Sequence, residues 1–462
     1  MRFLFILVDN VIESLILGIL IGVGGLYGVS FITEIGLVFL NLLQKDPMPI
    51  RYMDNHYDCL IVGAGISGLF SAREILKKHP DWNVIIVEQY KALGGRTTTY
   101  SYKDVHWEAG AGRIHKDHKH TMKLIKEYDL TWIPIPNQTF FKKDESTPII
   151  PNTFDDFSKV YLSVLANLPP NILAKHTIES LMNSIYGSSA TKELFSFFPY
   201  RAEINTLRAD LALNSFLEGE MSSHSNYGVI KEGFSELVNR IKNDITKKGC
   251  KILPGHKLLN LKYKDGITDC IFNKIVLKTK RVILALHRDA VEKLPVFRNW
   301  DVLDCLKSRP LLRVYGIFNK AWFPSPAPIV TPGLLRYIIP VGSKAIMVSY
   351  TDADDTKRFA NILKSGGEKA LEKVIMAESR KLFSDIEVPE PIYFKSHLWT
   401  TGATYWLPGN YSPETLSIKS IHPLPSVLPK VWLCGESWSL KQAWVEGALE
   451  HTLLCLSVID RK

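Results

Sequence analysis

The 462-residue chain is poor in cysteine, and its six cysteines are scattered without a single C-x-x-C pair. This spacing excludes a disulfide framework and a cysteine-rich zinc site, and it indicates free thiols in a reducing compartment. A strong excess of one charge is also lacking, because 56 Lys and Arg residues stand against 47 Asp and Glu residues. The lysines are spread out without interleaved aromatics, which argues against nucleic-acid binding and favours a solvated surface, with possible affinity for anionic membranes.

Four histidines gather in one stretch of the sequence, but the partners of a metal site are missing. Neither cysteine pairs nor acids at ligand spacing accompany His106, His115, His118 and His120. Zinc and related metals need such a set, so we expect surface or capping histidines here and no metal site.

Charged residues are absent between Glu13 and Glu34. A run of this length spans about 30 Å of hydrocarbon as a helix, so we predict a single transmembrane anchor within residues 1–43. A cleaved secretory signal is the main alternative, but the run is long for one and acidic residues precede it. A buried extension of the domain is the third interpretation.

The charges beside this span favour one orientation. Asp9 and Glu13 precede the span, whereas Lys45 and Arg51 follow it. Basic residues prefer the cytoplasmic side of a membrane, so we place the rest of the chain there, after a linker over residues 44–56.

After the linker come a short apolar run, a glycine-rich turn, a helical stretch and a second apolar run that ends in an acid. The apolar runs occupy residues 59–62 and 83–87, and the glycines have GxGxxG spacing. This order is typical of a strand, turn, helix and strand that bind a dinucleotide. The residues that we assign to this cofactor site are Gly63, Gly65, Ser67, Gly68 and Glu88.

Each residue type has a physical role in such a site. Gly63 permits the tight turn, Gly65 lets the backbone approach a pyrophosphate, and Gly68 lets the helix pack closely on the strand. The helix over residues 67–78 directs the positive end of its dipole at the phosphates. Glu88 is placed to accept hydrogen bonds from ribose hydroxyl groups.

A second glycine turn identifies the dinucleotide. Gly94, Gly95 and Arg96 lie within EQYKALGGRTTTY, which resembles the extended fingerprint of the flavin-containing amine oxidase family. The resemblance implies FAD as the cofactor, with Gly95 in the turn and Arg96 on the diphosphate. The alternative for Arg96 is an ordinary loop cation.

The segment WEAGAGRIH, residues 107–115, resembles the part of the family that approaches the flavin ring. The resemblance places the backbone of Gly112 and Arg113 near the isoalloxazine or ribityl region. Three roles stay open for the Arg113 side chain: a structural salt bridge, a contact with a substrate carboxylate, or stabilisation of the reduced ring.

The C-terminal stretches GESWS and QAWVEGALEH resemble the closing motif of the family. The resemblance implies that Glu436 binds the ribityl chain and that the backbone of Val445 donates to the flavin pyrimidine edge. Trp444 falls at one aromatic wall of the substrate cage, and we assign it to catalysis. The alternatives are a plain cap for Glu436 and core packing for Trp444.

The segment WTTGATYWLPG departs from the family pattern at two positions. Thr401 stands where monoamine oxidases carry the cysteine that links to flavin, and a hydroxyl cannot form that thioether, so we expect non-covalent FAD. Gly402 stands where they place the second aromatic of the cage. Tyr405 and Trp406 are either its replacement or part of the core.

The family also uses a lysine that reaches flavin N5 through a water molecule. The segment SRPLLRVYGIFNKAWF places Arg313 there, and we assign Arg313 to the catalytic site, with Lys320 as the alternative. Because arginine stays protonated where lysine can be tuned, this departure puts ordinary monoamine oxidation in doubt.

The resemblance covers the chain from Tyr57 onward, and 46% hydrophobic residues suffice for the cores of about two domains. It implies an α/β fold: a Rossmann-type FAD-binding domain with an interleaved α+β substrate domain. We assign residues 57–115, 226–297 and 426–462 to the first domain, and residues 116–225 and 298–425 to the second.

The predicted function is oxidation of a small-molecule amine, namely a primary or secondary amine, a polyamine or an amino acid. The flavin takes a hydride equivalent, and oxygen then reoxidises it to give hydrogen peroxide. One alternative is a desaturase or protoporphyrinogen-oxidase relative that acts on a lipidic substrate. Another is a membrane-tethered protein that binds FAD without catalysis.

Overall fold

The computed structural model describes residues 51–217 and 226–460 of the chain. The predicted membrane span lies outside these residues and stays a prediction. Within the described ranges, no helix is both long enough and apolar enough to cross a membrane. The description below concerns the unit formed by residues 53–462.

A five-stranded parallel sheet, in the order β11-β3-β2-β15-β21, carries the glycine-rich turn. Its strands come from all three stretches that we assigned to the FAD-binding domain. They are β2 (Cys59–Val62), β3 (Val84–Val87), β11 (Lys251–Leu253), β15 (Val282–Leu284) and β21 (Val431–Leu433). This sheet confirms the predicted α/β fold class.

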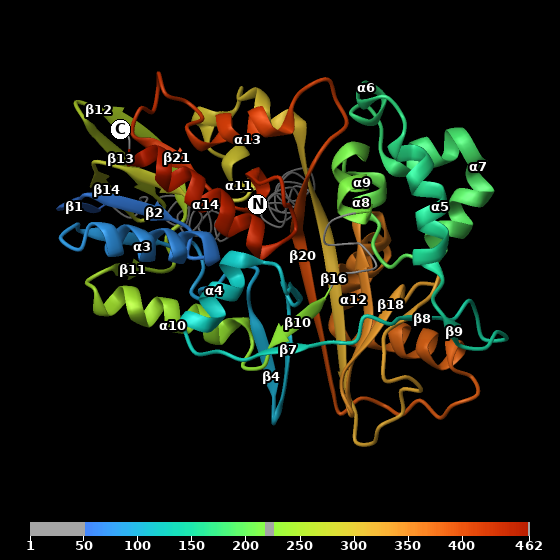
Figure 1. Cartoon of the computed structure of the whole chain (residues 1–462). Coiled ribbons are helices and arrows are strands. Elements are labelled where there is room, and N and C mark those ends of the chain that lie inside the picture. Colours follow the sequence, from blue (N-terminus) through green and yellow to red (C-terminus); the bar gives the residue numbers. More distant parts are fainter. Residues whose placement is uncertain (1–50, 218–225, 461–462) are drawn as a thin grey trace, which may run out of the picture. The chain divides into compact units, whose positions relative to one another are not determined.

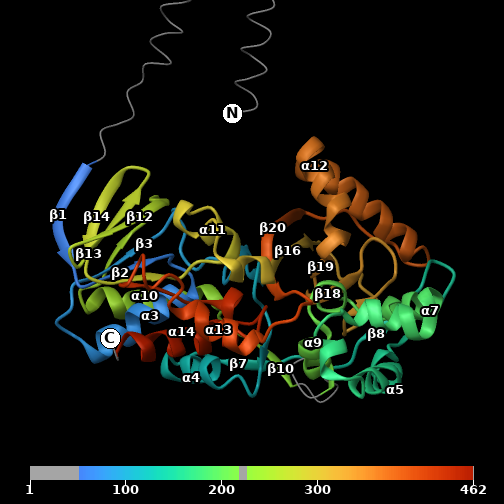
Figure 2. The same cartoon turned by 90° about the horizontal axis from the view of Figure 1, so that it is seen from above.

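Alternate residues of β2 enter two different hydrophobic cores. Cys59 and Ile61 pack among helices α3 (Ile66–Lys78), α10 (Phe234–Lys247) and α14 (Val445–Ile459). Leu60 and Val62 pack on the opposite side, with residues of a four-stranded sheet. The helices and this second sheet therefore cover the two faces of the parallel sheet (Figures 1 and 2). Burial on both faces explains why β2 is continuously apolar.

The four-stranded sheet has the order β1-β14-β13-β12. Its strands are β1 (Arg51–Tyr57), β12 (Leu258–Lys264), β13 (Ile267–Phe272) and β14 (Ile275–Thr279). Strand β1 begins inside the predicted linker over residues 44–56, so the end of that segment is part of a sheet.

A seven-stranded sheet in the order β20-β16-β19-β18-β17-β8-β9 dominates the other half of the unit. Its strands come from the two stretches that we assigned to the substrate domain. They are β8 (Phe140–Phe141), β9 (Ile150–Pro151), β16 (Leu306–Ile317), β17 (Ile329–Val330), β18 (Tyr337–Gly342), β19 (Ala345–Asp352) and β20 (Tyr393–Trp406). Helix α12 (Thr356–Leu382) packs on one face, against Leu312 and Val314 of β16.

The other elements complete the unit. A three-stranded sheet has the order β6-β10-β7, and β4 pairs with β5. These strands are β4 (Thr99–Tyr102), β5 (Val105–Glu108), β6 (Ile114–His115), β7 (Trp132–Pro134) and β10 (Tyr227–Ile230). The remaining helices are α4 (Lys119–Glu127), α5 (Phe154–Ala166), α6 (Pro170–Leu173), α7 (Ile178–Ser196), α8 (Ala202–Asn205), α9 (Ala209–Leu217), α11 (Arg288–Glu292) and α13 (Pro413–Ile421). Short 3₁₀ helices are η1 (Pro295–Phe297), η2 (Asp301–Cys305), η3 (Ala353–Asp355) and η4 (Glu436–Trp438).

Candidate flavin and substrate site

A cavity of about 1100 Å³ extends from the carboxyl ends of β2 and β3 to the seven-stranded sheet. It collects predicted site residues from both ends of the chain. Those that line it are Gly63, Gly65, Ser67, Glu88, Gly95, Arg96, Gly112, Arg113, Arg313, Glu436, Trp444 and Val445. Gly68 does not line the cavity but lies just behind its wall.

The three glycines of the first turn have different surroundings. Gly63 has a φ of +102°, and a Cβ there would lie 2.6 Å from the carbonyl oxygen of Ala285. A Cβ on Gly68 would lie 1.9 Å from the oxygen of Gly63, so the helix packs directly on the turn. A Cβ on Gly65 would lie 3.9 Å from its nearest neighbour, the carbonyl oxygen of Gly94. Helix α3 has no side-chain N-cap. The open turn and the bare helix amides fit a pyrophosphate.

Backbone amides fix the carboxylate of Glu88 at the edge of this turn. Its Oε2 accepts from the N–H of Ala64 at 2.8 Å, and its Oε1 accepts from the N–H of Tyr90 at 2.9 Å. Each carboxylate oxygen has a further acceptor position. Glu88 therefore fits the ribose contact that the sequence predicts.

Arg96 and Glu436 form an ion pair in the cavity wall, with Nη2 and Oε2 2.9 Å apart. Arg96 also donates from Nη1 to the carbonyl oxygen of Gly402 at 2.9 Å. Oε1 of Glu436 accepts from the amides of Thr404 and Ala443 at 3.0 and 2.9 Å. Glu436 thus positions Arg96, while the diphosphate and ribityl contacts of this pair stay predictions.

Arg313 extends from β16 to the backbone of the WEAGAGRIH turn. Its Nη1 donates to the carbonyl oxygen of Glu108 at 3.1 Å, and a Cβ on Gly112 would lie 3.2 Å from the same nitrogen. Lys320, the alternative, is exposed and forms an ion pair with Glu387 at 2.8 Å. The structure therefore brings Arg313, and not Lys320, to the cavity.

The carboxyl group of Glu108 is partly buried and lies near Arg313. It accepts from the N–H of Phe234 at 2.9 Å and from Oγ1 of Thr99 at 3.0 Å. Burial raises the pKa of Glu108 to about 7, against the opposing effect of these hydrogen bonds and of Arg313. The charge beside the predicted flavin position therefore changes near neutral pH.

The guanidinium group of Arg113 faces aromatic rings. Its central carbon lies 4.7 Å from the ring centroid of Tyr227, 5.1 Å from that of Tyr200 and 5.8 Å from that of Trp444. Trp444 in turn stacks on Tyr227, with centroids 5.8 Å apart. Arg113 has neither a hydrogen-bond partner nor an ion-pair partner among the described residues. Among the described residues, Arg113 therefore does not form the structural salt bridge that was one of the three roles considered for it.

Leu311 explains the glycine in the predicted aromatic cage. A Cβ on Gly402 would lie 2.7 Å from Cγ of Leu311, so an aromatic side chain does not fit there. Tyr405 lines the cavity, whereas Trp406 is fully buried and donates from Nε1 to the carbonyl oxygen of Ser439 at 3.0 Å. Tyr405 is therefore available as a wall of the cavity, and Trp406 belongs to the core.

Non-covalent cofactor binding fits the residues that are present. Thr401 lines the cavity and donates from Oγ1 to Asp289 at 3.2 Å. None of the described residues that line the cavity is a cysteine. All six cysteines of the chain are free thiols.

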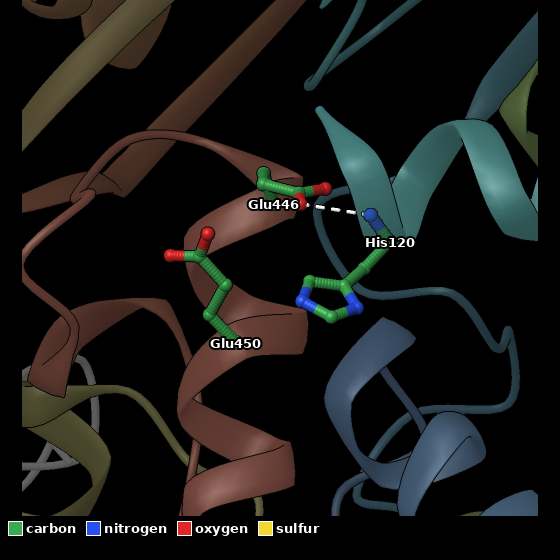
Figure 3. Close-up of side chains that lie close together, drawn as sticks. All are labelled: His120, Glu446 and Glu450. Carbon is green, nitrogen blue, oxygen red and sulfur yellow. Dashed lines mark hydrogen bonds between the residues drawn. The ribbon is translucent and has the colours of Figure 1, made fainter. Parts of the chain in front are cut away.

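His120, Glu446 and Glu450 bring three possible metal-ligand atoms within 4.8 Å of one another (Figure 3). Glu446 accepts from the backbone amides of His120 and Thr121, at 2.8 and 2.9 Å. Glu450 forms an ion pair with Lys441 at 2.8 Å. Both carboxylates therefore have protein partners, and Glu446 anchors the first turn of α4 to α14.

Several residues that line the cavity were not predicted from the sequence. Tyr200, Glu203, Tyr227, Tyr337 and Tyr350 all line the cavity beside or opposite Arg113. Only Tyr227 carried a signal, because it directly precedes the segment GVIKEGFSEL, which resembles the family. The others come from separate elements, and nothing in their local sequence places them together.

The fold is shared with solved oxidases. A cofactor-binding redesign of putrescine oxidase superposes with a TM-score of 0.69, and the wild-type enzyme bound to putrescine superposes with 0.68. Each is 14% identical in sequence, over 89% of this chain and 100% of that chain.

Sequence relatives match over short stretches. The L-amino-acid oxidase of Siganus canaliculatus is 42% identical over 81 residues, which are 17% of this chain and 15% of that one. An uncharacterised protein of Acanthamoeba polyphaga mimivirus is 29% identical over 126 residues, 25% of this chain and 24% of its own. Protoporphyrinogen oxidase 1 of Arabidopsis thaliana is 44% identical over 55 residues, 12% of this chain and 10% of its own. The chain thus matches at most about a quarter of the length of each of these curated relatives.

A family model covers most of the chain. The model of the flavin-containing amine oxidoreductases matches residues 66–454. This stretch begins at the first residue of α3, directly after Gly63 and Gly65 of the glycine-rich turn, and it includes most of the residues that line the cavity and most of α14. The chain therefore belongs to the flavin-containing amine oxidoreductase family.

Proposed function

We propose that this chain is an FAD-dependent oxidase of an amino acid, a substrate that carries a carboxylate beside its amine. The observation that supports this substrate is Arg113, a cation in the cavity wall that faces Tyr200, Tyr227 and Trp444. Leaving a partly buried charge unpaired is costly, and a guanidinium group binds a carboxylate through two parallel hydrogen bonds.

The cavity residues also suit the amine end of this substrate. When bound, FAD supplies the hydride acceptor for the carbon beside the amine, and oxygen regenerates it with release of peroxide. The rings of Trp444, Tyr227 and Tyr405 give the cavity apolar walls, which favour the neutral amine over ammonium. Arg113 orients the substrate by its carboxylate, and Arg313 places a fixed positive charge beside Gly112.

A likeness in sequence supports the same substrate class. One short match is to an L-amino-acid oxidase, and another is to an L-amino acid dehydrogenase of Synechocystis, at 28% identity over 91 residues. We further propose that residues 14–33 tether the enzyme to a membrane, since this uncharged run is long enough to span one.

The test compares amino acids with the amines that result from their decarboxylation, using peroxide release by the FAD-loaded chain. Phenylalanine is paired with phenethylamine, and lysine with cadaverine. At least one amino acid should exceed its amine by about 100-fold in kcat/KM, and Arg113→Gln should remove this preference. Arg113→Lys, the matched control, keeps the charge but loses the planar fork, so it should retain part of the preference. Equal turnover of amine and amino acid would rule out the carboxylate contact.

A further inference from the structure

A carboxyl group lines the same cavity as Arg113 but belongs to a different element. Glu203 lies on α8, and its Oε1 accepts from Oη of Tyr405 at 3.0 Å. Its Oε2 is buried and has no hydrogen-bond partner among the described residues. Buried carboxyl oxygens are normally paired, so Glu203 has acceptor capacity for one more N–H group.

A second carboxyl group lies behind the cavity wall. Asp352, at the end of β19, accepts from the N–H of Arg201 at 2.8 Å and from Oη of Tyr350 at 3.4 Å. Burial, above all, raises the pKa of both Glu203 and Asp352, and the charge of Glu203 raises that of Asp352 further, whereas Arg113 lowers the pKa of Glu203 and Arg336 lowers that of Asp352. Neither acid forms an ion pair with any residue in the described part of the chain. This corner of the cavity therefore favours an added positive charge.

Tyrosine rings separate this corner from Arg113. The ring of Tyr200 lies 5.1 Å from the guanidinium carbon of Arg113 and 5.3 Å from the ring of Tyr350. Tyr350 then reaches Asp352 through its hydroxyl group. The cavity thus presents a cation, Arg113, and a carboxyl group, Glu203, and the rings of Tyr200 and Tyr350 lie between Arg113 and the second carboxyl group, Asp352.

We propose that Glu203 binds a second, cationic group of the substrate, so that the substrate class is a basic amino acid. Its α-carboxylate pairs with Arg113, and its side-chain ammonium or guanidinium group donates to Glu203. This assignment rests on the proposed function, because it needs Arg113 to hold the carboxylate. The contact with Glu203 makes the positive charge on the substrate side chain the feature by which the site selects its substrate.

Binding of two unreactive carboxylates tests this assignment in the FAD-loaded full chain. Pentanoate and 5-guanidinopentanoate share a carboxylate and differ by the guanidinium group, and neither has an α-amine. Calorimetry and perturbation of the flavin spectrum report their affinities. The guanidino compound should bind at least about tenfold more tightly. Glu203→Gln should abolish this difference and leave pentanoate binding unchanged.

Two further variants separate the possible failures. Glu203→Asp keeps the charge and should retain part of the difference in affinity between the two compounds. This variant also tests the proposal if Glu203→Gln does not fold. Arg113→Gln should weaken the binding of both compounds by the same factor. If the two compounds bind alike, or if Glu203→Gln leaves their ratio intact, Glu203 does not bind the distal cation. If neither compound binds, or if Arg113→Gln has no effect, the carboxylate contact of the proposed function fails instead.

Discussion

Nη2 of Arg96 lies 2.9 Å from Oε2 of Glu436, so an ion pair joins the second glycine turn to the C-terminal motif. Glu436 is also held by two backbone amides, of Thr404 and Ala443. One carboxylate therefore connects β20, η4 and the turn before α14 to the predicted diphosphate position. Loss of this carboxylate should weaken FAD binding more than it destabilises the fold.

Glu436→Gln should weaken FAD binding by about tenfold, because the amide keeps the backbone contacts but loses the charge that holds Arg96. Equilibrium dialysis, with the released flavin quantified by its fluorescence, gives the dissociation constant of FAD. The matched control is Glu450→Gln, which breaks the ion pair between Glu450 of α14 and Lys441. Unchanged FAD affinity in Glu436→Gln would show that Arg96 does not depend on this pair.

The buried His397 should make the protein less stable in acid. Its Nε2 accepts from the indole N–H of Trp107 at 3.0 Å, and burial lowers its pKa to about 4, with help from Lys395. Between pH 6.5 and 4 the unfolded chain therefore binds a proton that the folded chain does not. The free energy of unfolding falls over this window, by up to about 3 kcal/mol.

The measurement is urea denaturation at intervals from pH 7.5 to 4. His397→Gln can still accept from Trp107 through its amide oxygen but does not titrate, so it should flatten part of this decline. A decline as steep in the variant as in the unmodified chain would mean that His397 is not responsible.

Glu446 should contribute to stability through the first turn of α4. Its carboxylate accepts from the amides of His120 and Thr121, and also from Oγ1 of Thr121 at 2.7 Å. Glu446→Ala leaves these buried donors unpaired and should cost about 2–4 kcal/mol. Glu450→Ala, the control, should cost less than about 1 kcal/mol, because its ion pair is partly exposed.

Chemical denaturation measures both variants, and a chelator arm tests the metal question. If Glu446 acts as a cap, EDTA should leave the melting temperature unchanged. A fall in melting temperature with EDTA, reversed by zinc or manganese, would instead assign His120, Glu446 and Glu450 to a metal site.

The nucleotide half of the cavity could be predicted because its residues are close in sequence and their roles are local. Gly63, Gly65, Gly68 and Glu88 belong to one strand-turn-helix-strand unit, whose geometry is set by backbone sterics. The fold class followed from the resemblance of the chain from Tyr57 onward to the family. The resemblance to the family also selected Arg313, which lines the cavity, while its catalytic role stays a prediction.

The substrate half could not be predicted in this way. Glu203, Tyr200 and Tyr350 meet only because α8 packs beside the seven-stranded sheet, and such long-range contacts leave no local pattern. The constraint on Gly402 was hidden for the same reason, since Leu311 lies on the neighbouring strand. The start of β1 at Arg51 was missed because its partner strand, β14, lies more than 200 residues later.

Anaerobic reduction of the bound flavin tests the proposed enzyme most directly. The purified FAD-loaded chain is mixed with basic, aromatic and aliphatic amino acids, and with putrescine and spermidine, and the visible absorbance of its flavin is followed. We expect basic amino acids to bleach the flavin, and oxygen to restore it with release of peroxide. A flavin spectrum that no amino acid and no amine bleaches would contradict the assignment as an amine-oxidising enzyme.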